Sequence, residues 1–291
     1  MIPGSSITFM IISAALSLVL PFAIFFIWRK KYDLKMVPLF LGIIAFFIFG
    51  EVLRDLIHSI VFNINAEGVE RFFAGNPVLL ILYLVIISAA LHETGRLIAF
   101  NVVKSKYEGI GVGLSYGIGN GGISAIIMGY HLVSVITASI MINNGTYITE
   151  GNEADFLAGV EAIAAANPAE FLVIGFGNVI TLAVQISLSM LVLSAVNKKG
   201  KLWLYPVAII LHSLVLLPET LFMTGAIKNM WLVQILLLAA AALTAYISYR
   251  FCIEYENKEE ETATTTENTT ESIETLVENY TTDDDTSEED I

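Results

Sequence analysis

The strongest constraint on the fold is a series of seven apolar runs, each long enough to cross a lipid bilayer. A spanning helix needs roughly 20 mainly apolar residues, and a helix satisfies its backbone N–H and C=O groups without water. Only 15% of the residues are charged, against about 25% in soluble domains. We therefore expect an all-α fold, a polytopic membrane helix bundle with about seven transmembrane helices. The runs cover 5–28, 37–62, 77–103, 111–142, 169–197, 202–224 and 229–252.

Charge divides the chain into two parts. The net charge is −13, but residues 254–291 carry −14 and residues 1–253 carry +1. A segment so rich in Glu, Asp and Thr buries too little apolar surface to offset the entropy cost of ordering. We predict a transmembrane helical domain over 1–253 and a disordered acidic cytoplasmic tail over 254–291. The tail either stays solvated or docks a regulatory partner.

The basic residues predict the orientation of the spans. They follow the first, third and fifth runs, and the alternate loops carry two, Arg71 and Lys228. Because loops rich in Lys and Arg stay in the cytoplasm, we expect the N-terminus outside and the C-terminus inside. No positive charge precedes the first run, which is therefore predicted to be a retained span and not a cleaved signal peptide.

We expect an integral protein of the plasma membrane. Its expected partners are the lipid bilayer and a membrane-embedded peptide substrate or partner helix, and no nucleic acid.

The third run carries three ionisable residues close together, His92, Glu93 and Arg96. Positions three and four apart lie on one helix face, so Arg96 can pair with Glu93 and lie beside His92. An ionisable group inside a membrane costs several kcal/mol and usually faces the bundle interior, where it pairs or functions. The set is either an ion pair that lets this helix pack inward or part of a functional site.

Three further polar residues, Asn120, Gln185 and His212, lie at a similar depth in the next three runs. At about 1.5 Å per residue, all of them fall near the bilayer midplane, as Glu93 does. Each also has a packing explanation. The glycines around Asn120 suit a close helix crossing, Gln185 suits an interhelical hydrogen bond, and His212 suits a paired core histidine.

A second polar cluster lies in the outer part of the second run. Glu51, Arg54, Asp55 and His58 follow the three-to-four spacing of one helix face. We predict a packed charge network near the outer interface, which Glu219 is positioned to join.

The mid-membrane set contains groups that a hydrolase needs. Glu93 would be the general base, and His212 or His92 would orient the water or donate a proton. Arg96 would keep the carboxylate ionised, and Asn120 would stabilise an oxyanion. His92, Glu93 and His212 are also acceptable ligands for a divalent metal such as zinc. The chain has no His-Glu-x-x-His motif, so the zinc signal is weak and the cofactor stays open.

Two segments carry a resemblance to a known family. They are Leu91-His92-Glu93-Thr94-Gly95-Arg96 and Tyr116-Gly117-Ile118-Gly119-Asn120-Gly121-Gly122. From about residue 5 to 250 the chain resembles the YhfC family of intramembrane proteases, which is related in concept to the CAAX-processing and bacteriocin-processing membrane proteases. The resemblance implies peptide hydrolysis within the membrane, with Glu93, Gly95, Arg96 and His212 at matching positions.

Four positions depart from the family pattern. His92 stands where the pattern has the first glutamate of a pair, and Asn120 stands in place of a histidine. Ser124 stands where another glutamate is expected, and Gln185 aligns with a further histidine. These departures fall on residues that would carry out chemistry, so they bear on catalysis more than on the fold.

Three functions therefore stay open. The first is an intramembrane protease that uses Glu93 and His212 and is impaired by these substitutions. The second is a non-catalytic relative that binds a membrane segment as a receptor or scaffold. The third is a small-solute transporter, which midplane polar residues and glycine-broken helices also suit, although the two chain halves show no inverted repeat.

Overall fold

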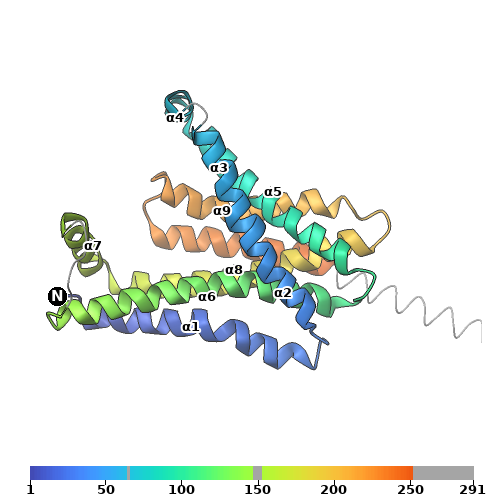
Figure 1. Cartoon of the computed structure of the whole chain (residues 1–291), viewed down its shortest axis with the longest axis horizontal. Helices are drawn as coiled ribbons and strands as arrows, with labels where there is room; N and C mark the ends of the chain where they lie inside the picture. The colour runs from blue at the N-terminus through green and yellow to red at the C-terminus, as the bar shows by residue number, and fades with distance from the viewer. Residues whose placement is uncertain (64–65, 147–152, 252–291) are drawn as a thin grey trace, which may run out of the picture. The chain divides into compact units, whose positions relative to one another are not determined.

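The computed structural model describes residues 1–63, 66–146 and 153–251, and this part of the chain is helical without a strand. Within these residues, seven helices are long and apolar enough to cross a membrane. They confirm the predicted all-α membrane bundle, and their ends lie within two residues of the predicted runs. The predicted tail, 254–291, lies outside the described residues. The spans are α1 (Gly4–Arg29), the composite span Met36–Asn63, α5 (Pro77–Val103), α6 (Ile110–Asn143), α8 (Pro168–Asn197), α9 (Leu204–Met223) and a final helix, Met230–Phe251 (Figure 1).

Residues Met1–Ser248 form one compact unit, and all packing below is within it; a second unit begins at Tyr249. Two short helices, α4 (Ala66–Gly75) and α7 (Glu153–Ala165), lie in segments that the sequence predicted to be loops. At 10 and 13 residues they are too short to cross a bilayer. They therefore leave the predicted span count unchanged.

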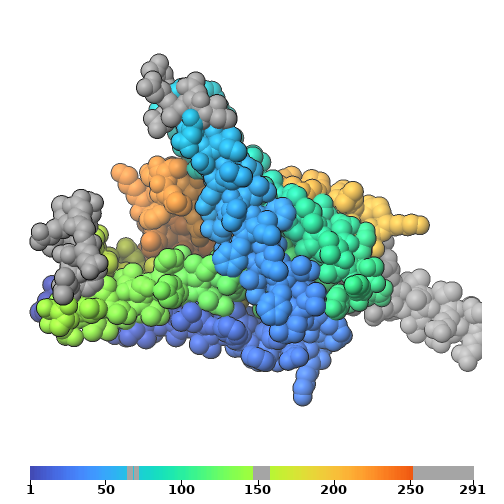
Figure 2. Space-filling view, in the orientation of Figure 1, coloured from blue at the N-terminus to red at the C-terminus, as the bar shows by residue number. Residues whose placement is uncertain are grey.

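Helix α6 packs against α1, α2 (Met36–Ala45) and α8, and in Figure 2 the second span lies across it. Its glycines allow this close packing on two sides. A Cβ added at Gly119 would meet the backbone carbonyl of Leu39 on α2, and one added at Gly117 would meet the backbone of Ile186 on α8. The predicted close helix crossing at this glycine run is confirmed, since small residues let helix backbones approach.

The second span is not a uniform α-helix. Between α2 and α3 (Arg54–Asn63) it contains a π-helical segment, η1 (Phe46–Leu53). Such segments are rare and often occur at functional sites. Here η1 packs against α5, and Gly50 lies directly against the ring of His92, which a Cβ at this position would meet. The π-helical turn therefore forms one wall beside the predicted site.

Three of the four residues of the second polar cluster, Glu51, Arg54 and Asp55, form a charge network where η1 meets α3. Arg54 lies 3.2 Å from Glu51 and 3.0 Å from Asp55. His58 instead pairs with the hydroxyl of Tyr83 on α5, 2.9 Å away. The expected fifth member, Glu219, lines a separate cavity with Asn178 and Gln234.

Candidate active site

Four buried polar side chains from three helices meet in the interior of the unit. Glu93 and Arg96 come from α5, Gln185 from α8 and His212 from α9, and each pair of these helices is in contact. Glu93 and Arg96 are 0% exposed, His212 is 1% exposed and Gln185 is 6% exposed. Buried polar groups in a membrane need partners inside the protein, and these residues supply them for one another.

Arg96 is the main donor of this network. Its Nη1 donates to both carboxylate oxygens of Glu93, and its Nη2 donates to Oε1 of Gln185. The three-residue spacing of Glu93 and Arg96 puts both on one face of α5, as the sequence predicted. The predicted ion pair is therefore present, and it neutralises the charge of Glu93 where it lies.

The hydrogen bonds fix the orientation of the His212 ring. Its Nδ1 lies 2.6 Å from Oε1 of Glu93, and its Nε2 lies 3.4 Å from Nε2 of Gln185. A carboxylate paired with Arg96 can only accept, so Nδ1 of His212 carries the hydrogen. The Gln185 nitrogen can only donate, and the amide cannot be reversed because its oxygen accepts from Arg96. The Nε2 of His212 is therefore the bare nitrogen of a neutral imidazole.

His92 lies beside this network, and within the described residues it has no hydrogen bond to it. Its ring centroid is 5.3 Å from that of His212 and 6.2 Å from that of Phe46. Within the described residues, its Nδ1 is a buried atom without a hydrogen-bond partner, and the same holds for Nε of Arg96 and the hydroxyl of Tyr116. The Arg96 guanidinium lies 5.7 Å from the centroid of the Tyr116 ring. Polar capacity thus remains unused around the network.

Asn120, like His92, is a predicted site residue that has no hydrogen bond to the network in the described part of the chain. Its Nδ2 donates to the backbone carbonyl of Gly42 on α2, 3.2 Å away, while its Oδ1 has no partner among the described residues. The carbonyl of Gly42 fixes the amide orientation, since only a nitrogen can face it as a donor. The free atom of Asn120 is thus an acceptor, which does not suit its predicted role as an oxyanion donor.

Two residues around the site had no chemical role in the prediction. For Gln185 the sequence predicts an interhelical hydrogen bond, which the structure shows with Arg96 and His212, but it does not predict that this bond orients a site residue. Tyr116 appeared only as the first residue of the glycine motif. Its packing under Arg96 depends on how α6 is rotated, which the motif does not specify.

A known family covers the region that holds these residues. The sequence model of the family described as YhfC intramembrane metalloprotease matches residues 16–237. The chain belongs to this family. It is also 28% identical over 251 residues to the uncharacterized membrane protein YhfC of Bacillus subtilis (strain 168), covering 84% of this chain and 96% of that protein. No solved structure matches the chain. The predicted family resemblance is thus confirmed, and the protein is an integral membrane protein of the YhfC family.

The YhfC family description implies a metal, and the donor set of this chain can be compared with that expectation. A catalytic zinc site has three protein ligands and an open position. In the described residues, no three His, Cys, Asp or Glu side chains are positioned to share a metal ion. Arg96 donates to both oxygens of Glu93, and Nδ1 of His212 faces the same carboxylate. As arranged, His92, Glu93 and His212 do not fit a metal.

Proposed function

We propose that this chain hydrolyses a membrane-embedded peptide. In this proposal His212 accepts a proton from water and later donates it to the leaving amine, and Glu93 orients the imidazole of His212. The observation that carries the proposal is the 2.6 Å contact between Nδ1 of His212 and Oε1 of Glu93. A histidine whose one nitrogen is held by a buried carboxylate has its other nitrogen aimed and ready to accept a proton. Membership of a family described as intramembrane metalloproteases supports the same reaction class.

The geometry favours His212 over Glu93 as the base. Both oxygens of Glu93 accept from Arg96, and one also accepts from His212. A carboxylate so occupied has little capacity to take a proton from water. The bare Nε2 of His212 has a long contact of 3.4 Å with Gln185, which a water molecule can replace at small cost because neutral hydrogen bonds have a net worth of about 1 kcal/mol.

The proposed reaction consumes one water molecule for each peptide bond that is cleaved. A water proton moves to Nε2 of His212 while the water oxygen attacks the peptide carbonyl carbon. Glu93 stabilises the imidazolium that forms. The Nε of Arg96 and the hydroxyl of Tyr116 are buried donors without partners in the described part of the chain, and they are candidates to hold the oxyanion. His212 then returns the proton to the leaving amine as the C–N bond breaks.

Access to this site requires the helices to separate. Glu93 and Arg96 are 0% exposed, and the hydroxyls of Thr94 on α5 and Tyr205 on α9 lie 2.8 Å apart. We propose that a substrate segment enters when contacts of this kind between α5 and α9 open. Closure would then exclude bulk water from the reaction.

The test compares new protein termini in membranes that contain wild-type protein or a variant. His212→Ala and Glu93→Ala are expected to abolish the termini that depend on wild-type protein. His131→Ala is the matched control, because His131 is an exposed histidine on α6. An identical set of termini in all four membranes would refute proteolysis.

The enclosure of the site favours a second function, binding of a membrane segment without cleavage. A charge-neutralised network with Arg96 on both oxygens of Glu93 can stabilise the bundle with no water entering. A receptor and a protease can be distinguished by whether new protein termini form. A receptor would retain a bound segment in the His212→Ala variant and would generate no new termini in the wild type.

We also propose the location and orientation of the protein. The basic residues that follow α1, α5 and α8 support a plasma-membrane protein with its N-terminus outside and its C-terminus inside. The net charge of −14 over residues 254–291 supports a solvated cytoplasmic tail.

A further inference from the structure

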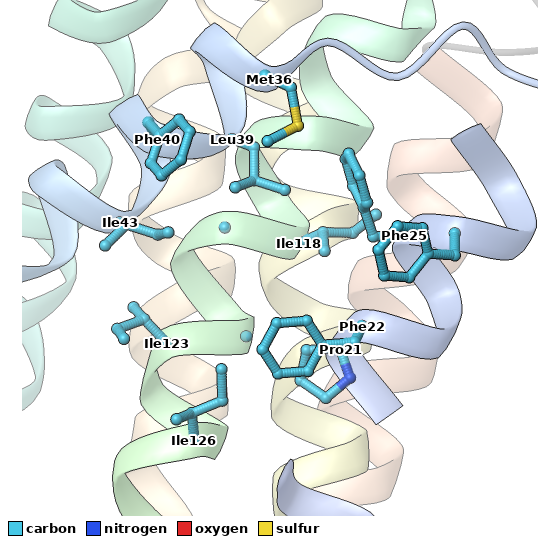
Figure 3. Close-up of a pocket in the computed structure, with 13 residues that line it drawn as sticks. Pro21, Phe22, Phe25, Met36, Leu39, Phe40, Ile43, Ile118, Ile123 and Ile126 are labelled. Carbon is cyan, nitrogen blue, oxygen red and sulfur yellow. The ribbon is translucent and has the colours of Figure 1, made fainter. Parts of the chain in front are cut away.

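An apolar groove of about 260 Å³ lies between α1, α2 and α6, and every residue that lines it is apolar or glycine. Figure 3 shows Phe22 and Phe25 of α1 on one side of the groove, Leu39 and Phe40 of α2 on the other, and Ile123 of α6 below Leu39 and Phe40. None of these residues belongs to the proposed catalytic network. The groove is therefore a separate feature of the unit.

The groove faces the lipid and not the bundle interior. Phe22 and Phe40, on its opposite walls, are 55% and 53% exposed. Gly119 and Gly122 of α6 also line it, and a Cβ at Gly122 would meet Pro21 of α1. The two glycines therefore let α1 and α2 pack closely on α6, and the volume of about 260 Å³ between the apolar walls is the room for a slender apolar chain.

A basic cluster adjoins one end of this groove. The chain leaves α1 through three exposed basic residues, Arg29, Lys30 and Lys31, and returns into the groove at Met36. The guanidinium of Arg29 lies 5.9 Å from the ring centroid of Phe25, which lines the groove. Lys35 pairs with Asp33 at 2.6 Å, whereas the salt bridges found among the described residues include none with the three other cations.

We propose that this groove binds one anionic phospholipid, with an acyl chain along the groove and the phosphate at Arg29, Lys30 and Lys31. The charges lie at the end of a span, where a bilayer presents its headgroups, and the apolar lining lies at the depth of its acyl chains. Basic residues beside a membrane attract anionic lipid by about 1 kcal/mol each, which corresponds to about fivefold in affinity.

The same charges argue against a second copy of this chain as the occupant. A symmetric pair formed through the groove would bring two basic clusters together at one membrane surface, because a two-fold interface uses the same patch on both subunits. Like charges placed in this way repel. A partner helix would fill the apolar groove without using the basic cluster at its end.

The test uses the purified full chain and counts retained lipids by native mass spectrometry. Phosphatidylglycerol and phosphatidylcholine with identical acyl chains are offered together. We expect phosphatidylglycerol to be retained at least tenfold over phosphatidylcholine, and the triple variant Arg29→Gln, Lys30→Gln, Lys31→Gln to lower this preference at least tenfold. The matched control is Lys104→Gln, Lys106→Gln, Lys199→Gln, which removes the same charge from exposed residues after α5 and α8 and is expected to change retention less than twofold.

A second measurement locates the lipid without any substitution. A phosphatidylglycerol with a photoreactive acyl chain is expected to label wild-type peptides that contain Leu39–Ile43 or Ile118–Ile126. The variant Leu39→Trp, which fills the groove, is expected to lower that labelling at least fivefold. Equal retention of the two lipids, an equal loss in the control variant, labelling elsewhere, or cross-links from the groove to a second protein segment would each overturn the proposal.

Discussion

The carboxylate of Glu93 and the imidazole of His212 lie 2.6 Å apart, although 119 residues separate them in the chain. Arg96 and Gln185 complete a closed set of partners around this pair. In a membrane interior, such a set satisfies the polar groups and also orients His212. The stability of the bundle and the proposed chemistry therefore depend on the same hydrogen bonds.

Removing one member of the buried ion pair is expected to destabilise the protein strongly. Arg96→Met leaves Glu93 buried without its cation, and losing one partner of a buried pair costs about 3–5 kcal/mol. The double variant Glu93→Gln, Arg96→Met removes both charges and is expected to recover at least half of that loss. Thermal unfolding in detergent measures both variants. A double variant less stable than Arg96→Met would contradict the account.

The contact between Gly50 and His92 predicts a suppressor pair. A Cβ at Gly50 would meet the His92 ring, so Gly50→Ala is expected to cost about 1–3 kcal/mol through overpacking. In a His92→Ala background the space is free, and the same substitution is expected to be neutral or to stabilise by up to about 1 kcal/mol. A double-mutant cycle on unfolding free energies measures this coupling. Additive effects would show that the two residues do not touch.

The glycine crossing predicts a contrast between two helices. Gly119→Ala would force its Cβ against the backbone carbonyl of Leu39, which cannot rotate away. We expect a loss of at least about 1–3 kcal/mol. Gly159→Ala on α7 is the matched control, because a Cβ there meets nothing within 4 Å, and it is expected to stabilise by about 0.5–1 kcal/mol. Thermal unfolding that ranks these two variants in the reverse order would exclude the close crossing.

The proposed orientation predicts which positions react with a membrane-impermeant maleimide in intact cells. The background is Cys252→Ser, which removes the single cysteine of the chain. Asn144→Cys, after α6, is expected to react from outside, whereas Lys199→Cys, after α8, is expected to react only after the cells are opened. Both positions are exposed. The opposite pattern would reverse the assignment of the N-terminus.

The seven spans could be predicted from the sequence because hydropathy and span length determine them almost alone. Depth could be predicted too, since the rise along a helix places Glu93, Gln185 and His212 at one level. The hydrogen-bond partner of each polar residue could not be predicted, because it depends on how each helix is rotated about its axis. The residue next to Asn120, Gly121, lies against Gln185 of α8, but close packing of α6 on α2 gives Asn120 itself Gly42 as its partner.

The role of each site residue could be predicted only in part, because some of its contacts lie within one helix and others reach a second helix. Arg96 was expected to keep Glu93 ionised, and its position three residues along the same helix is enough to predict the pair. That Nη2 of the same guanidinium also reaches Gln185 depends on α8, which the local spacing does not describe. This second contact orients the amide and, through it, leaves Nε2 of His212 bare.

Peptide hydrolysis by His212 and Glu93 can be measured by the incorporation of an oxygen isotope from water. Purified protein in liposomes is given the segments whose termini depend on wild-type protein in cells, in water enriched in ¹⁸O. We predict one ¹⁸O atom in each new carboxyl terminus, a loss of at least about 100-fold in His212→Ala, and unchanged cleavage in His131→Ala. Cleavage at the wild-type rate in His212→Ala, or no incorporation with the wild-type protein, would contradict the claim.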